Sequence, residues 1–187
     1  MPLVEVYTNM VPSFQELARL RYTRWMIRPF RPGDAPACCR IIHDCLEADT
    51  SYAPALRSKV RAGEKPQSMT ERARLYYIAV YEEEGRVLGF AGLDMNEIRL
   101  LYIDPGFRCR GIGRSLLEHL LEMVPGSLFP EIFVYSTLGA VGFYESCGFK
   151  SKGPFVFDLE GVPLQTVFMS RHIPDSSLKS WNLESGI

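Results

Sequence analysis

Apolar residues in the middle of the chain come in short runs, rich in aromatic and β-branched side chains, that turn-forming residues separate. Tyr76–Tyr81, Val87–Leu93 and Glu97–Ile103 are three such runs. Glu82–Gly85 joins the first two with the composition of a hairpin turn, and Asp104-Pro105-Gly106 ends the third. Runs of this length and composition predict three consecutive β-strands.

Other segments have helical spacing. Apolar residues in Ile112–Val124 recur every three or four positions, which predicts an amphipathic helix. Asp34–Glu47 reads as a helix capped by its first residue, Tyr52–Gly63 as a less regular one, and Ser68–Glu71 as a capping box that opens a short helical turn. The side of the main helix expected to face the core comprises Ile112, Leu116, Leu120 and Met123, beside Leu117, Leu121 and Val124.

Four further strands and one helix complete the predicted elements. The strands are Trp25–Phe30, Glu131–Tyr135, Phe149–Asp158 and Leu164–Arg171, and the helix is Leu138–Cys147. Strands and helices in this mixed order predict an α/β (α+β) fold. Its central sheet is expected to be mixed and mostly antiparallel, with about six to seven strands and helices on its faces.

The length of 187 residues suits one domain with additions at its ends. Residues 1–24 are predicted to form an N-terminal helical extension, because Ser13–Glu16 has capping-box form. Residues 25–172 are assigned to the domain. Residues 173–187 are assigned to a C-terminal tail because they are mostly polar.

Composition narrows the classes of function. A formal net charge of −1 gives no overall field that would attract nucleic acid or an anionic membrane, so neither is an expected partner. No apolar run approaches the roughly 20 residues that span a bilayer. The five cysteines fit neither a disulfide framework nor a zinc pattern, so we expect no metal and a reducing, cytoplasmic setting.

The strongest chemical signal lies between the third predicted strand and the main helix. Arg108-Cys109-Arg110-Gly111-Ile112-Gly113 precedes a helix start, where free backbone N–H groups and the helix dipole favour an anion. The glycines are expected to let phosphate oxygens approach the backbone. Arg108, Arg110, Arg114 and Ser115 can add hydrogen bonds. A tight strand-to-helix turn is the alternative interpretation.

Two other nucleotide loops fit less well. A nucleoside-triphosphate loop would end in Gly-Lys-Ser or Gly-Lys-Thr, which is absent here. A dinucleotide fingerprint needs a third glycine where Leu116 stands, and it follows a parallel strand.

With these residues in place, the chain resembles the GNAT superfamily of acyl-CoA N-acyltransferases. Arg108–Gly113 is similar to the family's phosphate-loop signature, and Leu101–Pro105 to the strand before it. Ala140–Phe149, with Phe143-Tyr144 and Gly148-Phe149, resembles the later helix and strand, and Ile27–Asp34 the opening segment. The resemblance covers Trp25–Arg171.

This resemblance implies that an amine attacks the thioester of acetyl-CoA directly, in a ternary complex. By similarity, Tyr144 is the general acid, with a core tyrosine as the alternative. Glu97 is the candidate base, acting through water, with a solvated carboxylate as the alternative. Strand alternation is expected to put Glu97 and Arg99 on the side of Leu101 and Ile103.

The predicted acetyl-CoA contacts include the main chain of the strand, where the Leu101 N–H can also polarise the thioester carbonyl. Thr137 stands where many relatives carry asparagine, and a hydroxyl cannot reproduce an amide's paired donor and acceptor. The full expected set is Leu101, Tyr102, Ile103, Arg108, Cys109, Arg110, Gly111, Ile112, Gly113, Arg114, Ser115 and Thr137.

The function implied is N-acetyl transfer to a primary amine, on a small molecule, a peptide or a protein. The acceptor is expected over residues 47–62 and the last turn between strands, with Tyr52 and Arg57 as candidate contacts. Two alternatives stay open: a non-catalytic acyl-CoA sensor or scaffold, and an interaction protein that has lost CoA. A homodimer is compatible with the family.

Overall fold

The structure is a computed structural model that describes residues 26–49 and 52–174. The predicted N-terminal extension, residues 1–24, lies outside these ranges. All but two residues of the predicted tail, 173–187, also lie outside them.

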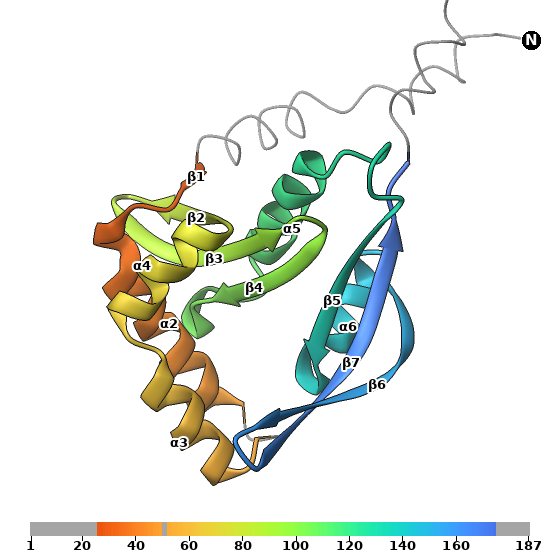
Figure 1. The fold of residues 1–187 in the computed structure, drawn as a ribbon. Helices are drawn as coiled ribbons and strands as arrows, with labels where there is room; N and C mark the ends of the chain where they lie inside the picture. The colour runs from red at the N-terminus through yellow and green to blue at the C-terminus, as the bar shows by residue number, and fades with distance from the viewer. Residues whose placement is uncertain (1–25, 50–51, 175–187) are drawn as a thin grey trace, which may run out of the picture.

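The described residues form one seven-stranded sheet, with the strands in the order β1-β2-β3-β4-β5-β7-β6 (Figure 1). Every neighbouring pair is antiparallel except β4 and β5, which are parallel. This confirms the predicted mixed, mostly antiparallel sheet. The strands are β1 (Ile27–Pro29), β2 (Tyr77–Glu83), β3 (Arg86–Asp94), β4 (Glu97–Ile103), β5 (Glu131–Thr137), β6 (Lys150–Leu159) and β7 (Val162–His172).

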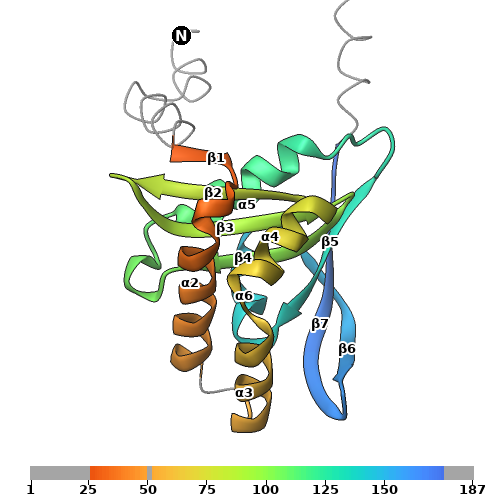
Figure 2. The same ribbon diagram turned by 60° about the vertical axis from the view of Figure 1, so that its left-hand side comes forward.

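Helices cover both faces of the sheet (Figures 1 and 2). On one face lie α2 (Ala35–Ala48) and α4 (Pro66–Leu75), with α3 (Pro54–Gly63) between them in the chain. On the other lie α5 (Ile112–Met123) and α6 (Val141–Ser146). Each face therefore has its own core, which we call the α2 core and the α5 core.

The predicted stripe on the main helix packs in the α5 core, with one exception. Leu116, Leu117 and Leu120 are fully buried there, as the helical spacing predicts. Met123 is 44% exposed, so its predicted place in the core is wrong. The helix ends at Met123. The backbone at Val124 is extended, and the Val124 side chain is buried in the α5 core in place of Met123.

Two predicted helix starts also differ from the structure. Ser68 lies inside α4, which begins at Pro66, because proline suits a first helical turn that needs no N–H donor there. The predicted helix Leu138–Cys147 is shorter. Its first three residues form the 3₁₀ turn η3 (Leu138–Ala140), and α6 follows. Two more 3₁₀ turns, η1 (Pro32–Asp34) and η2 (Pro105–Phe107), follow β1 and β4.

Candidate active site

The two parallel strands in the middle of the sheet are paired only where they begin. The register joins Glu97 to Phe133 and Ile98 to Val134, and the Phe133 N–H donates to the Asn96 carbonyl over 2.9 Å. Further along, the described part of β4 pairs only with β3, and that of β5 only with β7. The strands therefore part at their carboxyl ends (Figure 1). We call the region between residues 100–103 and 135–137 the strand fork.

A β-bulge lies at the base of the fork. Ile98 and Leu100 stand opposite consecutive residues of β3, so Arg99 is an extra residue in β4. An extra residue shifts the side-chain alternation by one position. As a result Ile98, Leu101 and Ile103 all pack in the α5 core, although the first two are three residues apart.

The predicted alternation that put Glu97 on the side of Leu101 is therefore wrong. Glu97 precedes Ile98, so it points to the opposite face of the sheet, toward the α2 core. There it accepts a hydrogen bond of 3.0 Å from Arg99, and the two form an ion pair. A base at Glu97 would have to act from the α2 face, and this role stays a prediction.

The backbone N–H and C=O groups of every second residue in β4 face the fork. The Asp104 N–H donates to the Leu88 carbonyl of β3 over 2.8 Å. Because main-chain direction alternates along a strand, the peptide groups of Leu101 and Ile103 face β5 and those of Tyr102 face β3. The Ile103 carbonyl accepts a bond of 3.2 Å from the thiol of Cys45 on α2. Leu101 and Ile103 are thus the β4 residues whose main chain could bond a ligand in the fork.

Asp104 fixes the end of β4 and the start of the loop. Its buried carboxylate accepts hydrogen bonds from the Gly106 N–H (3.1 Å), from Arg40 (3.1 Å) and from Arg86 (3.0 Å). Burial alone would raise the pKa of Asp104, but these three donors hold it below its ordinary value. The charged carboxylate of Asp104 thereby connects α2, β3 and the loop.

The start of α5 has the geometry that an anion site needs. Gly111 is the residue before the helix and has a left-handed backbone, with φ of 85°. The first helical hydrogen bond runs from the Ser115 N–H to the Gly111 carbonyl over 3.0 Å. The N–H groups of Ile112, Gly113 and Arg114 precede it and have no partner within the helix. Apart from its neighbours in the chain, no atom of the described residues lies within 4 Å of where a Gly111 side chain would start. The loop residues therefore fit a pyrophosphate.

Gly113 also lies where α5 packs against α6. A Cβ there would lie 3.3 Å from the Phe143 ring and 3.7 Å from Ile103. Packing of α5 against α6 therefore also favours a small residue at 113. The expectation that this glycine lets phosphate oxygens approach the backbone stays a prediction.

The loop arginines contact protein groups in this structure. Arg114 donates to the Ser146 carbonyl of α6 over 3.2 Å, and Arg110 lies 5.2 Å from the centre of the Phe107 ring. Arg108 lies beside Cys45, whose pKa is raised by burial while a hydrogen bond with Arg108 opposes that rise. Arg108 and Arg110 on the loop and Arg114 in the first turn of α5 are exposed, and their bonds to phosphate stay predictions. The Cys109 thiol is exposed as well.

Tyr144 lies on α6, with its ring buried in the α5 core. The ring contacts Phe143 and Phe149, at centroid distances of 5.2 and 5.3 Å. His43 Nε2 is the one buried polar side-chain atom in the described residues that has no hydrogen-bond partner. Tyr144 itself is 4% exposed. Burial raises the pKa of Tyr144, so the hydroxyl holds its proton at neutral pH.

Thr137, at the end of β5, connects the fork to the segment after α2. Burial raises the pKa of Tyr52, and a hydrogen bond with the Thr137 side chain opposes that rise. The Thr137 hydroxyl, predicted to contact the cofactor, therefore lies beside Tyr52, a predicted acceptor contact.

One feature near the fork was missed from the sequence. Tyr135 on β5 is surrounded by four other rings, with centroids 4.7 to 6.0 Å away. The sequence signal was present, because aromatic residues alternate along β5 and β6. We call this set the aromatic face; it consists of Phe133, Tyr135, Phe155, Phe157 and Phe168.

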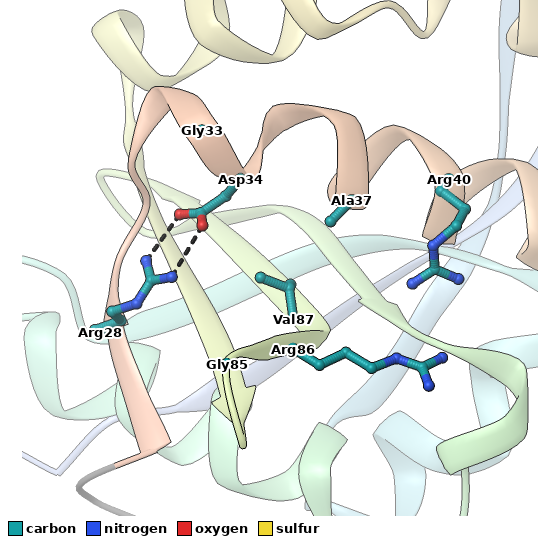
Figure 3. A pocket seen from close by; sticks show the side chains of 8 residues that line it. All are labelled: Arg28, Gly33, Asp34, Ala37, Arg40, Gly85, Arg86 and Val87. Atoms are coloured by element: carbon teal, nitrogen blue, oxygen red, sulfur yellow. Dashed lines mark hydrogen bonds and ion pairs between the residues drawn. The ribbon is translucent and has the colours of Figure 1, made fainter.

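A pocket of about 490 Å³ lies elsewhere, between the start of α2 and the turn that joins β2 and β3 (Figure 3). Arg28 in its wall donates two bonds to Asp34, of 2.8 and 2.9 Å, and also pairs with Glu82. Arg40 and Arg86 are held by Asp104. The charges of this pocket are matched inside the protein, so we do not assign it to the site.

The described residues meet the requirements of neither a metal site nor a membrane-spanning helix. In residues 26–49 and 52–174, no three His, Cys, Asp or Glu side chains are arranged to hold a metal ion. None of the helices described is long and apolar enough to cross a membrane.

Comparison with known proteins identifies the family. Residues 55–166 match the acetyltransferase (GNAT) domain. The chain is 37% identical over 128 residues to the peptidyl-lysine N-acetyltransferase YjaB of Escherichia coli, covering 67% of this chain and 79% of that protein. Identity to YjaB of Salmonella typhimurium is 39% over 87 residues, 46% of this chain and 58% of the relative.

A solved structure shares the fold. The fold is similar to a GCN5-related N-acetyltransferase from Rhodopseudomonas palustris, with a TM-score of 0.73 and 21% identity, over 78% of this chain and 94% of that one. The phosphate loop, the strand fork and these matches lead to one conclusion: the chain belongs to the GNAT family and is an acetyl-CoA-dependent N-acetyltransferase.

Proposed function

We propose that this enzyme transfers the acetyl group of acetyl-CoA to the ε-amine of a lysine in a peptide or protein. The observation that carries the proposal is the strand fork, which opens beside the start of α5. The similarity to the E. coli peptidyl-lysine enzyme supports lysine as the acceptor.

Acetyl-CoA would lie along the fork, with its pyrophosphate at the loop. The N–H groups of Ile112, Gly113 and Arg114 would donate to phosphate oxygens, helped by the helix dipole. Pantetheine would bond the main chain of Leu101 and Ile103, which faces β5. The side chains of Arg108, Arg110 and Ser115 can turn toward phosphate from their exposed or half-buried positions.

The chemistry is nucleophilic attack of a neutral amine on the thioester carbonyl. The new C–N bond forms and the C–S bond breaks; the amine loses one proton and the departing thiolate gains one. Tyr144 is the candidate donor of that proton, because its hydroxyl stays protonated at neutral pH. The Leu101 N–H would stabilise the developing oxyanion. Water would carry the proton from the amine, and Glu97 could receive it on the α2 face.

The thiols of the chain fit a reducing compartment, and we propose the cytoplasm. All five cysteines are free, and four of them are buried. Burial raises the pKa of Cys38 to about 12, so this thiol is unreactive at neutral pH.

The test uses purified protein, acetyl-CoA and a panel of Nα-blocked peptides that contain one lysine. We expect release of free CoA thiol together with acetylation of the peptide, read by mass spectrometry. The matched control is the same peptide with arginine in place of lysine, which should not react. CoA binding without thiol release for any peptide or small amine would instead indicate a sensor.

A further inference from the structure

The aromatic face begins where the two central strands part. Ile132 and Val134 of β5 pack in the α5 core, so Phe133 and Tyr135 point to the opposite side of the sheet. That is also the side on which Tyr102 of β4 packs in the α2 core. The aromatic face and the α2 face of the fork are therefore continuous. An amine that enters the fork from the α2 side, opposite α5, would therefore pass next to the aromatic face.

The five rings do not belong to either core of the described residues. Phe155 is 42% exposed, and the other four rings are half-buried. No arginine or lysine of the described residues lies over these rings, since the two cation–π contacts found there both involve Phe107. The rings thus offer an apolar surface with no charge of its own.

The tip of the β6–β7 hairpin is tied to α3 beside this surface. Lys59 of α3 donates to the Glu160 carbonyl over 2.9 Å and pairs with the Glu160 carboxylate over 2.8 Å. Tyr52 lies beside Thr137 at the end of β5, and the Thr137 side chain opposes the rise that burial causes in the pKa of Tyr52. These contacts hold the segment after α2 and the hairpin at the margin of the fork, and they pair the charges near the aromatic face.

From this arrangement we infer that the acceptor lysine has a bulky apolar residue next to it in sequence, which packs on the aromatic face. The inference rests on the proposed transfer to a peptide lysine. Tyr135 is one same-face step, about 7 Å, from Thr137 at the open end of the fork. A residue one or two positions from the lysine lies about 3.5 to 7 Å along an extended peptide, so it can reach the rings while the lysine enters the fork. Burial of part of an aromatic side chain on these rings removes apolar surface from water and favours binding.

The experiment compares two blocked peptides that differ at one position, acetyl-Gly-Gly-Lys-Phe-Gly-amide and acetyl-Gly-Gly-Lys-Ser-Gly-amide. We expect kcat/KM, read by thiol release, to be about 10-fold higher for the phenylalanine peptide, a difference of about 1.4 kcal/mol. Phe155→Ser should reduce that ratio to below about 3-fold, and so should Phe157→Ser. Val156→Ser is the matched control, because Val156 lies on the same strand, is 56% exposed and points to the other side. It should retain the full ratio, and thermal melting of each variant shows that it is folded.

Equal kcat/KM for the two peptides would overturn the inference while leaving lysine transfer in place. A ratio that survives both Phe155→Ser and Phe157→Ser would overturn it too, because the preference would then come from another surface. If small amines react and no lysine peptide does, the proposed function itself is wrong, and the inference falls with it.

Discussion

Phe143 on α6 packs against the position where a side chain at Gly113 on α5 would begin, with 3.3 Å between its ring and an ideal Cβ. A larger residue at this position of the loop would therefore crowd the contact between two helices. The second, Gly111, has open space around it and a positive φ instead. The two glycines of the motif thus serve different purposes, and mutations can separate them.

Gly113→Val should lower the free energy of unfolding by about 1 to 3 kcal/mol, because the added methyl groups meet the Phe143 ring. In a Phe143→Ala background, Gly113→Val should lower the free energy of unfolding by less, with a coupling energy between the two substitutions of at least about 0.5 kcal/mol. Chemical denaturation of the two single variants and the double variant measures this. If the free-energy changes of the two single variants add up to that of the double variant, the Phe143 ring moves aside without cost and the contact has no energetic role.

Gly111→Ala should reduce CoA affinity by about 10- to 100-fold, the effect expected if a charge-assisted bond to phosphate is lost. It should also cost about 1 kcal/mol of stability, because alanine is strained at a φ of 85°. Gly85→Ala is the matched control, with a φ of 76° and equally open surroundings in the β2–β3 turn. Calorimetry should find the same loss of stability in both variants and the loss of CoA affinity only in Gly111→Ala. Equal CoA affinities would contradict the phosphate assignment.

Asp104→Asn should destabilise the protein by roughly 1 to 2 kcal/mol at neutral pH, because Arg40 and Arg86 lose their shared carboxylate. The pKa of Asp104 is lower in the folded protein than in the unfolded chain. Its contribution is therefore complete above the unfolded pKa of about 3.9 and is lost as pH falls through the folded value.

The difference from the wild type should accordingly shrink below about pH 4 in denaturation experiments across pH. Asp44→Asn removes another partner of Arg40, but one that is largely exposed, so it should cost no more than about 0.5 kcal/mol. A difference for Asp104→Asn that stays constant with pH would contradict the charged state assigned to it.

Tyr144→Phe should lower turnover by about 100-fold if the hydroxyl donates a proton to the thiolate. CoA affinity should change little, because the ring packs in the α5 core and the loop is untouched. Steady-state kinetics with calorimetry separates the two effects. Phe149→Leu, which alters the same ring cluster without removing a hydroxyl, is the control for packing. An unchanged rate in Tyr144→Phe would leave Tyr144 as a core residue.

Local patterns predicted much of this fold. The residues of β4 match the predicted strand, because a β-branched and aromatic run between two turns has few alternatives. The start of α5 after Gly111 was also predicted, since glycine and helical spacing are both local signals.

Features that depend on pairing across the sheet could not be predicted in this way. The bulge at Arg99 exists only in the register between β3 and β4, and it reversed the expected side of Glu97. The contact between Gly113 and Phe143 joins residues 30 positions apart, which no spacing reveals. The aromatic alternation was visible in two strands, but their meeting around Tyr135 depends on the sheet order β5-β7-β6.

Amide hydrogen exchange with and without CoA tests the central claim most directly, because it reports on the strand fork and the phosphate loop at once. We predict that CoA slows exchange at Leu101 and Ile103, whose main chain faces the fork, and at the N–H groups of Ile112, Gly113 and Arg114. The Tyr102 amide, which faces β3, should change little. Protection confined to other parts of the sheet, or unchanged exchange at all five of these amides while CoA is bound, would contradict the site described here.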